Sequence, residues 1–134
     1  MGILNKLTRR KKTEEKTPEK VEDVTTELEK FLANDKETYK ALQRSMILDP
    51  REVEASMKEA VEKAKELEKQ RDTLRARMWY EVAGGLAIYE GDVKKVKEYF
   101  SKCTKLSPNI EYPILENTER AVQKAQEYYK KYLE

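Results

Sequence analysis

Apolar residues recur three and four positions apart along most of this chain, which is the period of an amphipathic helix. In the first such stretch they fall at Val21, Val24, Leu28 and Phe31. After Asn34-Asp35 the pattern continues at Tyr39, Leu42 and Met46. Either Asn34-Asp35 ends one helix and caps a second, or it marks a kink in a single helix.

A long central helix is predicted next. Asp49-Pro50-Arg51-Glu52 places a capping carboxylate first, proline at the first helical position and glutamate at the third, which favours a helix start. The apolar seam that follows is Val53, Met57, Ala60, Ala64, Leu67, Arg71, Leu74 and Met78. Steps of four and three let a long helix lie along another at a shallow angle. We expect one helix over residues 50–89, with Arg71 extending its guanidinium to the helix edge.

Residues 78–89 are apolar on every side of the predicted helix. Besides Met78, the apolar positions are Trp79, Tyr80, Val82, Leu86, Ile88 and Tyr89. A helix that is apolar all round is buried on several sides or joins an oligomer interface. We therefore take Trp79, Tyr80, Leu86 and Tyr89 as the candidate interaction surface.

Gly84-Gly85 lies inside this apolar helix. A phosphate-binding loop needs glycines between a strand and a helix N-terminus, so that backbone amides converge on the anion. No strand precedes these glycines, and no Lys-Ser/Thr follows them. The expected role is close packing, because a missing side chain lets a neighbouring helix approach.

Two shorter helices complete the predicted fold. Asp92 is placed to cap the first, which presents Val93, Val96, Phe100 and Cys103 and ends before Ser107-Pro108-Asn109. The last begins near Pro113 or Asn117 and shows Ile114, Ala121, Val122, Ala125, Tyr128, Tyr129 and Tyr132. We predict an all-α fold: a small bundle of four or five helices with a long central helix and a C-terminal helical hairpin, forming one domain over residues 21–134.

A helical hairpin over residues 80–113 resembles a tetratricopeptide repeat in the spacing of its turn and packing residues. These are Tyr80, Gly84, Gly91-Asp92, Phe100, Cys103 and Pro108, within residues 80–113, about a quarter of the chain. One copy is visible. The resemblance implies two antiparallel helices with a small residue where they cross, and a groove that binds peptides or partner proteins.

Composition and charge separate a basic arm from a charged helical body. Of the 134 residues, 40% are charged and only four are glycine, which is typical of long helices with solvated faces. Compositions this rich in Glu and Lys are also common in thermophile proteins. Residues 1–20 hold seven Lys/Arg and three Glu, a balance of +4, so the net charge of +2 leaves −2 for the rest. The body as a whole is therefore not expected to bind duplex nucleic acid across its surface.

The arm over residues 1–20 is predicted to be disordered, because it holds few apolar residues. Its candidate contacts are two leucines followed by four cations: Leu4, Leu7, Arg9, Arg10, Lys11 and Lys12. Three alternatives stay open for them: an anionic membrane surface, the phosphates of nucleic acid or a ribosome, and a tail that only adds solubility.

The side chains that most catalytic and metal sites need are scarce. The chain has no histidine, so Ser-His and Cys-His pairs and imidazole ligands are excluded. Cys103, the single cysteine, is expected to be a small buried residue, and the tyrosines near the C-terminus are expected to pack in the core. We predict no enzyme activity, no metal and no cofactor.

No apolar run approaches the length of a membrane span, and we expect a cytoplasmic protein. The predicted function is a non-enzymatic protein–protein interaction module or assembly subunit that self-associates through residues 78–89. The alternative is association with nucleic acid, a ribosome or a membrane surface through the basic arm.

Overall fold

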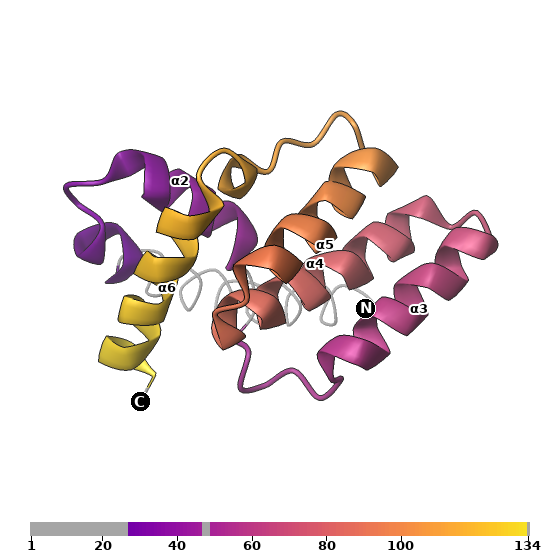
Figure 1. Ribbon diagram of the computed structural model, residues 1–134, viewed down its shortest axis with the longest axis horizontal. Helices are drawn as coiled ribbons and strands as arrows, with labels where there is room; N and C mark the ends of the chain where they lie inside the picture. The colour runs from indigo at the N-terminus through magenta and orange to yellow at the C-terminus, as the bar shows by residue number, and fades with distance from the viewer. Residues whose placement is uncertain (1–26, 47–48, 134) are drawn as a thin grey trace, which may run out of the picture.

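A computed structural model describes residues 27–46 and 49–133 of the chain (Figure 1). The described residues form helices and no strand, which confirms the predicted all-α bundle. A helical turn over residues 27–31 comes first. The elements after it are α2 (Lys36–Ser45), α3 (Met57–Lys69), α4 (Thr73–Glu90), α5 (Val93–Leu106), the 3-10 turn η1 (Pro113–Leu115) and α6 (Thr118–Tyr132).

Helix α4 lies between α3 and α5, and the three run side by side (Figure 1). The turns that join them are short, so neighbouring helices are antiparallel. Helix α3 packs almost entirely on α4, whereas α4 also contacts α2 and α6. Helices α2 and α6 pack together with η1 at the end of the molecule away from the α3–α4 turn.

The single rod predicted over residues 50–89 is wrong, because the chain turns back between α3 and α4. Arg71 adopts a left-handed backbone with φ of 62°, a conformation that costs a residue with a side chain roughly 1–2 kcal/mol. Asp72 then begins α4, since its carboxylate accepts a hydrogen bond from the Arg75 backbone N–H at 3.2 Å. Arg71 is therefore a turn residue and not part of a packed seam.

The start of α3 also differs from the prediction. Asp49 accepts a hydrogen bond from the Arg51 backbone N–H at 2.9 Å, but this closes only a local turn. The helix begins at Met57, where Ser56 and Glu59 form a capping box with bonds of 3.1 and 3.0 Å. Because a capping box satisfies two free backbone N–H groups, it fixes the start more firmly than the Asp49 turn.

Asn34-Asp35 separates two helices, so the first of the two alternatives for this segment is correct. Asp35 begins α2, where its carboxylate accepts bonds from the Thr38 N–H at 3.2 Å and hydroxyl at 2.7 Å. Arg120 of α6 donates to the same carboxylate at 2.7 Å. The bonds from Thr38 and Arg120 lower the pKa of Asp35 from 3.8 to about 2, so the carboxylate stays charged and links α2 to α6.

The turn predicted between α4 and α5 is confirmed. Gly91 ends α4 with φ of 77°, which glycine adopts without strain, and Asp92 caps α5 by accepting from the Lys95 N–H at 3.1 Å. Close packing at Gly84 is confirmed as well. A Cβ atom there would lie 2.6 Å from Cε2 of Phe100, so the α5 ring occupies the space that a side chain would need.

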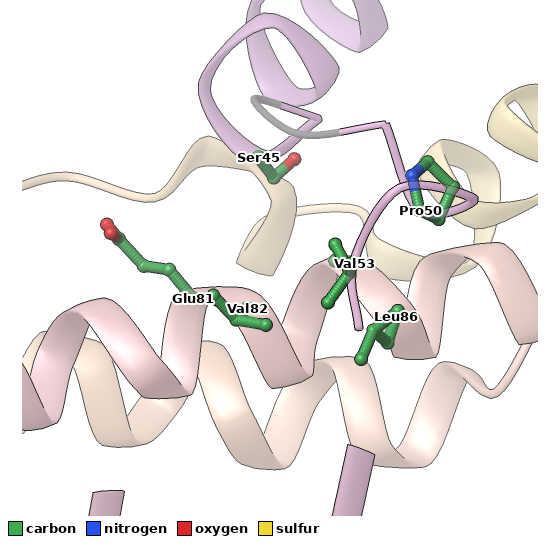
Figure 2. Close-up of a pocket in the computed structure, with 7 residues that line it drawn as sticks. Ser45, Pro50, Val53, Glu81, Val82 and Leu86 are labelled. Atoms are coloured by element: carbon green, nitrogen blue, oxygen red, sulfur yellow. The ribbon is translucent and has the colours of Figure 1, made fainter. Parts of the chain in front are cut away.

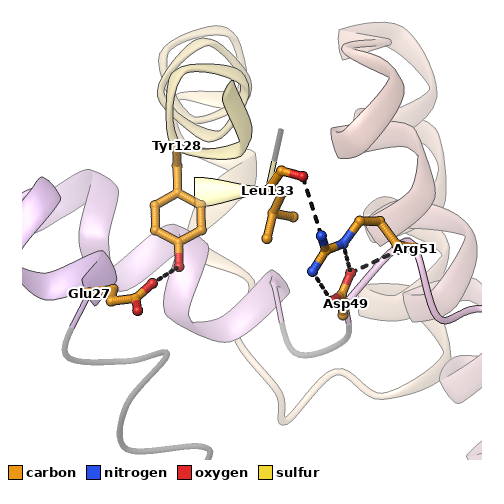
Figure 3. A network of polar contacts seen from close by, with 5 residues as sticks. All are labelled: Glu27, Asp49, Arg51, Tyr128 and Leu133. Atoms are coloured by element: carbon orange, nitrogen blue, oxygen red, sulfur yellow. Dashed lines mark hydrogen bonds and ion pairs between the residues drawn. The ribbon is translucent and has the colours of Figure 1, made fainter. Parts of the chain in front are cut away.

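The C-terminal helix closes the bundle with aromatic side chains. Tyr128 and Tyr129 are buried, as predicted, and Phe31 meets Tyr128 edge-to-face with ring centroids 5.9 Å apart. Figure 3 shows the polar contacts around this end. The Tyr128 hydroxyl donates to Glu27 at 3.4 Å, and Arg51 donates to the Leu133 carbonyl at 3.2 Å.

Replacing Gly84 by alanine is expected to destabilise the fold, although alanine is the better helix former. The new methyl group would collide with Phe100, and overpacking of this kind costs about 1–3 kcal/mol. Gly85→Ala is the matched control. Its nearest atom would be the Ser45 carbonyl oxygen at 3.9 Å, so this variant should gain about 0.5–1 kcal/mol from helix propensity alone.

Urea unfolding of both variants measures the two effects. If Gly84→Ala proves as stable as Gly85→Ala, the close approach of α4 and α5 is not a constraint on the fold.

Candidate interaction surface

Helix α4 is apolar on two opposite sides. Its core side carries the buried residues Ala76, Tyr80, Ala83, Gly84, Ala87 and Ile88. Its opposite side, which we call the outer face, carries Leu74, Met78, Val82, Gly85, Leu86 and Tyr89. Since α3 and α5 pack on the core side, the outer face is the part of this helix that is available for further contacts.

The second half of the outer face is covered by the chain's own residues. Val53, from the segment before α3, lies against Val82 and Leu86, and Ser45 and Pro50 border the same place (Figure 2). The space left between these side chains is about 10 Å³, enough for one water molecule and no ligand. Tyr89 packs edge-to-face on Tyr129 of α6, with ring centroids 5.1 Å apart. This half therefore belongs to the packing of the bundle.

The first half of the outer face is open. Leu74 is 59% exposed and Met78 is 51% exposed, one helical turn apart. We call these two residues the open patch. The predicted seam is confirmed at Met57, Ala60 and Ala64, which are buried. It is wrong for Leu74 and Met78, because the chain reverses at Arg71 and brings α3 onto the other side of α4. Trp79, which follows Met78 in the chain, is half-buried, and the Lys63 ammonium of α3 lies 5.0 Å from its ring centroid.

The four residues predicted as an interaction surface do not lie on one face. Tyr80 is only 1% exposed and is therefore a core residue. Its hydroxyl donates to Glu68 of α3, and its ring stacks on Tyr99 of α5 at 6.5 Å. Trp79 and Leu86 are half-buried and Tyr89 is 36% exposed. The arm candidates Leu4, Leu7, Arg9, Arg10, Lys11 and Lys12 lie outside the described residues.

A polar cluster sits between α4, α5 and the segment before η1. Arg77 and Glu81 form an ion pair at 3.2 Å, with 13% and 11% of their side chains exposed. The Tyr112 hydroxyl donates to the same Glu81 carboxylate, and Arg44 of α2 lies over the Tyr112 ring at 5.4 Å. Because the charges are paired and shielded, the cluster fixes how these segments fit together. Burial and the bond to Glu81 raise the pKa of Tyr112.

Cys103 is fully buried beside this cluster, which confirms its predicted place in the core. Its Sγ lies 3.6 Å from the Arg77 carbonyl oxygen. Burial, together with the nearby Glu81 charge, raises the pKa of the thiol to about 12. A nucleophilic cysteine needs a lowered pKa and access to solvent, and Cys103 has neither.

Within the part of the chain that the structure describes, no three His, Cys, Asp or Glu side chains are grouped so that they hold a metal ion. None of the helices described here has both the length and the hydropathy needed to span a bilayer.

Comparison with known proteins gave no match to a protein-family model, a curated protein or a solved structure. Helices α4 and α5 do form an antiparallel hairpin with Gly84 at the crossing. An antiparallel pair of helices is common to many helical bundles, and none of these findings supports the resemblance to a tetratricopeptide repeat.

The Cys103 thiol is expected to react with iodoacetamide far more slowly in the folded protein than in the unfolded chain. At pH 8 a pKa of about 12 leaves about a thousandfold less thiolate than the ordinary value of 9.0, and the side chain is shielded as well. Mass spectrometry of timed samples in buffer and in urea measures the ratio.

The matched control is Ser101→Cys in a Cys103→Ser background, because Ser101 is exposed on the same helix. This variant should be labelled quickly in the folded protein. Equal labelling rates for folded and unfolded wild-type chain would contradict the buried, inert thiol.

Proposed function

We propose that this chain is a non-enzymatic helical module whose open patch pairs with the open patch of a second copy. The observation that supports this is the exposure of Leu74 and Met78, the two apolar side chains of α4 that are more than half exposed. Apolar side chains one turn apart on a helix are the anchors by which helices dock on other helices. Self-association would remove these two side chains from water, and this burial is the favourable contribution to its free energy.

The position of the patch favours a symmetric pair. Leu74 and Met78 lie in the first half of α4, near the α3–α4 turn, at the end of the molecule away from α2 and α6 (Figure 1). In an antiparallel pair Leu74 of each copy would lie near Met78 of the other, so that one patch is complementary to itself, as a two-fold interface requires.

The small size of the patch limits the strength of this association. Fully burying a leucine or methionine contributes about 1.5–3 kcal/mol, and these residues are already partly covered. Association also costs several kcal/mol in lost motional freedom. The gain from burial and the cost of association are of similar size, so the patch alone gives a dissociation constant of roughly 1 mM or weaker. The proposed assembly is thus weak and reversible unless a further contact adds to it.

The alternative role for the arm, contact with nucleic acid, a ribosome or a membrane surface, rests on residues outside the described part of the chain. It stays a prediction from the sequence.

Sedimentation equilibrium of the full chain between about 10 μM and 1 mM tests the proposal. We expect the wild-type protein to change from monomer toward dimer over this range. Leu74→Lys with Met78→Lys should remain monomeric, because two added charges on each copy repel and the apolar anchors are removed. Circular dichroism checks that the variant keeps its helices.

The matched control adds the same two charges at other exposed sites, Ser101→Lys with Gln123→Lys. This control should dimerise like the wild type. A wild-type protein that is monomeric at every concentration, or a patch variant that still dimerises, would refute the proposed interface.

A further inference from the structure

Helix α5 carries an uneven distribution of charge that the summed charge of the chain conceals. It holds five lysines and one glutamate, a balance of +4, whereas α3 holds four of each sign and α4 two of each, so both are neutral. The lysines are Lys94, Lys95, Lys97, Lys102 and Lys105, and all but the half-buried Lys102 are exposed. We call these five residues the lysine face.

The buried side of α5 explains why the lysines share one side of the helix. Val96, Tyr99, Phe100 and Cys103 turn to the core, so every charged residue of this helix stands on the opposite arc. Glu98 is the single carboxylate on that arc.

Folding does not account for the lysine face. Among the described residues, none of its five ammonium groups lies within 4.0 Å of a carboxylate. Lys94 and Lys95 occupy the first turn of α5, at the positive end of the helix dipole, where carboxylates are favoured and cations are not. The first turns of α2, α3 and α6 each contain a glutamate instead (Glu37, Glu59 and Glu119), whereas α4, like α5, has no acidic residue there.

The chemistry of this surface selects among anionic partners. The large apolar side chains exposed on the described residues are Leu74, Met78 and Tyr89, and none of these belongs to α5. A helix that lies on a membrane needs apolar side chains beside its cations. Protein interfaces are depleted in lysine and built around apolar or aromatic anchors. A bare row of ammonium groups instead suits a row of phosphates, which needs only opposite charge.

The length of the face fits several phosphates. Lys94 and Lys105 are eleven residues apart, which corresponds to about 16 Å along an α-helix. One strand of a B-form duplex carries a phosphate about every 3.4 Å of axial rise and winds round the axis, so a straight face of this length can contact several phosphates but not every one that it passes. The face has no arginine, asparagine, glutamine or aromatic side chain, which are the usual groups for reading bases or stacking on them.

We infer that the lysine face of α5 binds the phosphate backbone of a nucleic-acid duplex without reading its sequence. This site is separate from the open patch on α4 and consists of other residues than the cations of the N-terminal arm. The summed charge of residues 21–134 is −2, yet one helix within them carries +4, so the sum does not exclude a local site for nucleic acid.

Fluorescence anisotropy with the full chain tests the inference. The probes are a labelled 24-base-pair DNA duplex and an RNA duplex of the same length, titrated at several KCl concentrations between about 50 and 200 mM. The test variant is Lys94→Gln with Lys97→Gln and Lys105→Gln. The matched control removes three exposed lysines from α3, Lys58→Gln with Lys65→Gln and Lys69→Gln, so that net charge falls equally. Lys63 is kept because it lies over Trp79.

We expect the affinity of the α5 variant to fall at least tenfold at 50 mM KCl. The slope of log affinity against log salt concentration should become shallower by up to about 2.7, since each phosphate that a lysine no longer neutralises reduces the slope by about 0.9. The α3 control should bind like the wild type. A weaker affinity for DNA alone, RNA alone or both supports the site and identifies the duplex it takes.

A variant that neutralises Arg9, Arg10, Lys11 and Lys12 separates the arm from α5, because the α5 effect must persist when the arm is altered. The inference is overturned if wild-type protein binds neither duplex, if the α5 variant binds like the wild type, or if the affinity of the α3 control falls as much. It is also overturned if labelled polyglutamate binds more tightly than either duplex with the same dependence on α5, which would indicate an acidic protein partner. Circular dichroism shows whether each variant retains the wild-type helical content.

Discussion

The contact between Gly84 of α4 and the Phe100 ring of α5 is the constraint on which the rest of the fold depends. Alanines at 76, 83 and 87 continue the small-residue side of α4 in both directions. Because these side chains are small, neighbouring helices can pack close to the α4 backbone. Helix α3 packs on one flank of this side and α5 on the other. A chain of 134 residues can thus bury a central helix without a large core.

The same arrangement decides which surfaces remain for other molecules. With α3 and α5 on the core side of α4, only other segments of the chain can cover the outer face. Val53 and the end of α2 cover its second half, and the open patch remains. Helix α5 is an outer member of the three helices that run side by side, so it buries one side and exposes the lysine face on the other. The two proposed binding surfaces are therefore distinct, one apolar and one cationic. A protein chain that used both surfaces at once would link a nucleic-acid backbone to a second copy of the protein.

Much of the fold follows from the sequence where a side chain has one clear structural use. Helical spacing, the glycine turn before Asp92 and the close approach at Gly84 are all predicted correctly. The long rod is wrong because its break lies at Arg71, and a left-handed residue with a side chain gives no signal comparable to glycine. Ser56 and Glu59 form a recognisable capping box, which is a better start signal than Pro50. The open patch escapes prediction for the same reason, since a seam drawn through Arg71 assigns Leu74 and Met78 to the core. The lysine face escapes it because the summed charge of the body is close to neutral, whereas α5 alone carries +4.

Native-state hydrogen exchange of the α4 backbone amides tests most directly whether this helix is the centre of the fold. If α3 and α5 both depend on close packing against it, the amides from Tyr80 to Ile88 should exchange only when the whole protein unfolds. Their exchange free energy should then equal the unfolding free energy from urea titration and exceed that of the amides in α2. Exchange of the α4 amides through a local opening, at a lower free energy than those of α2 or α6, would contradict the account.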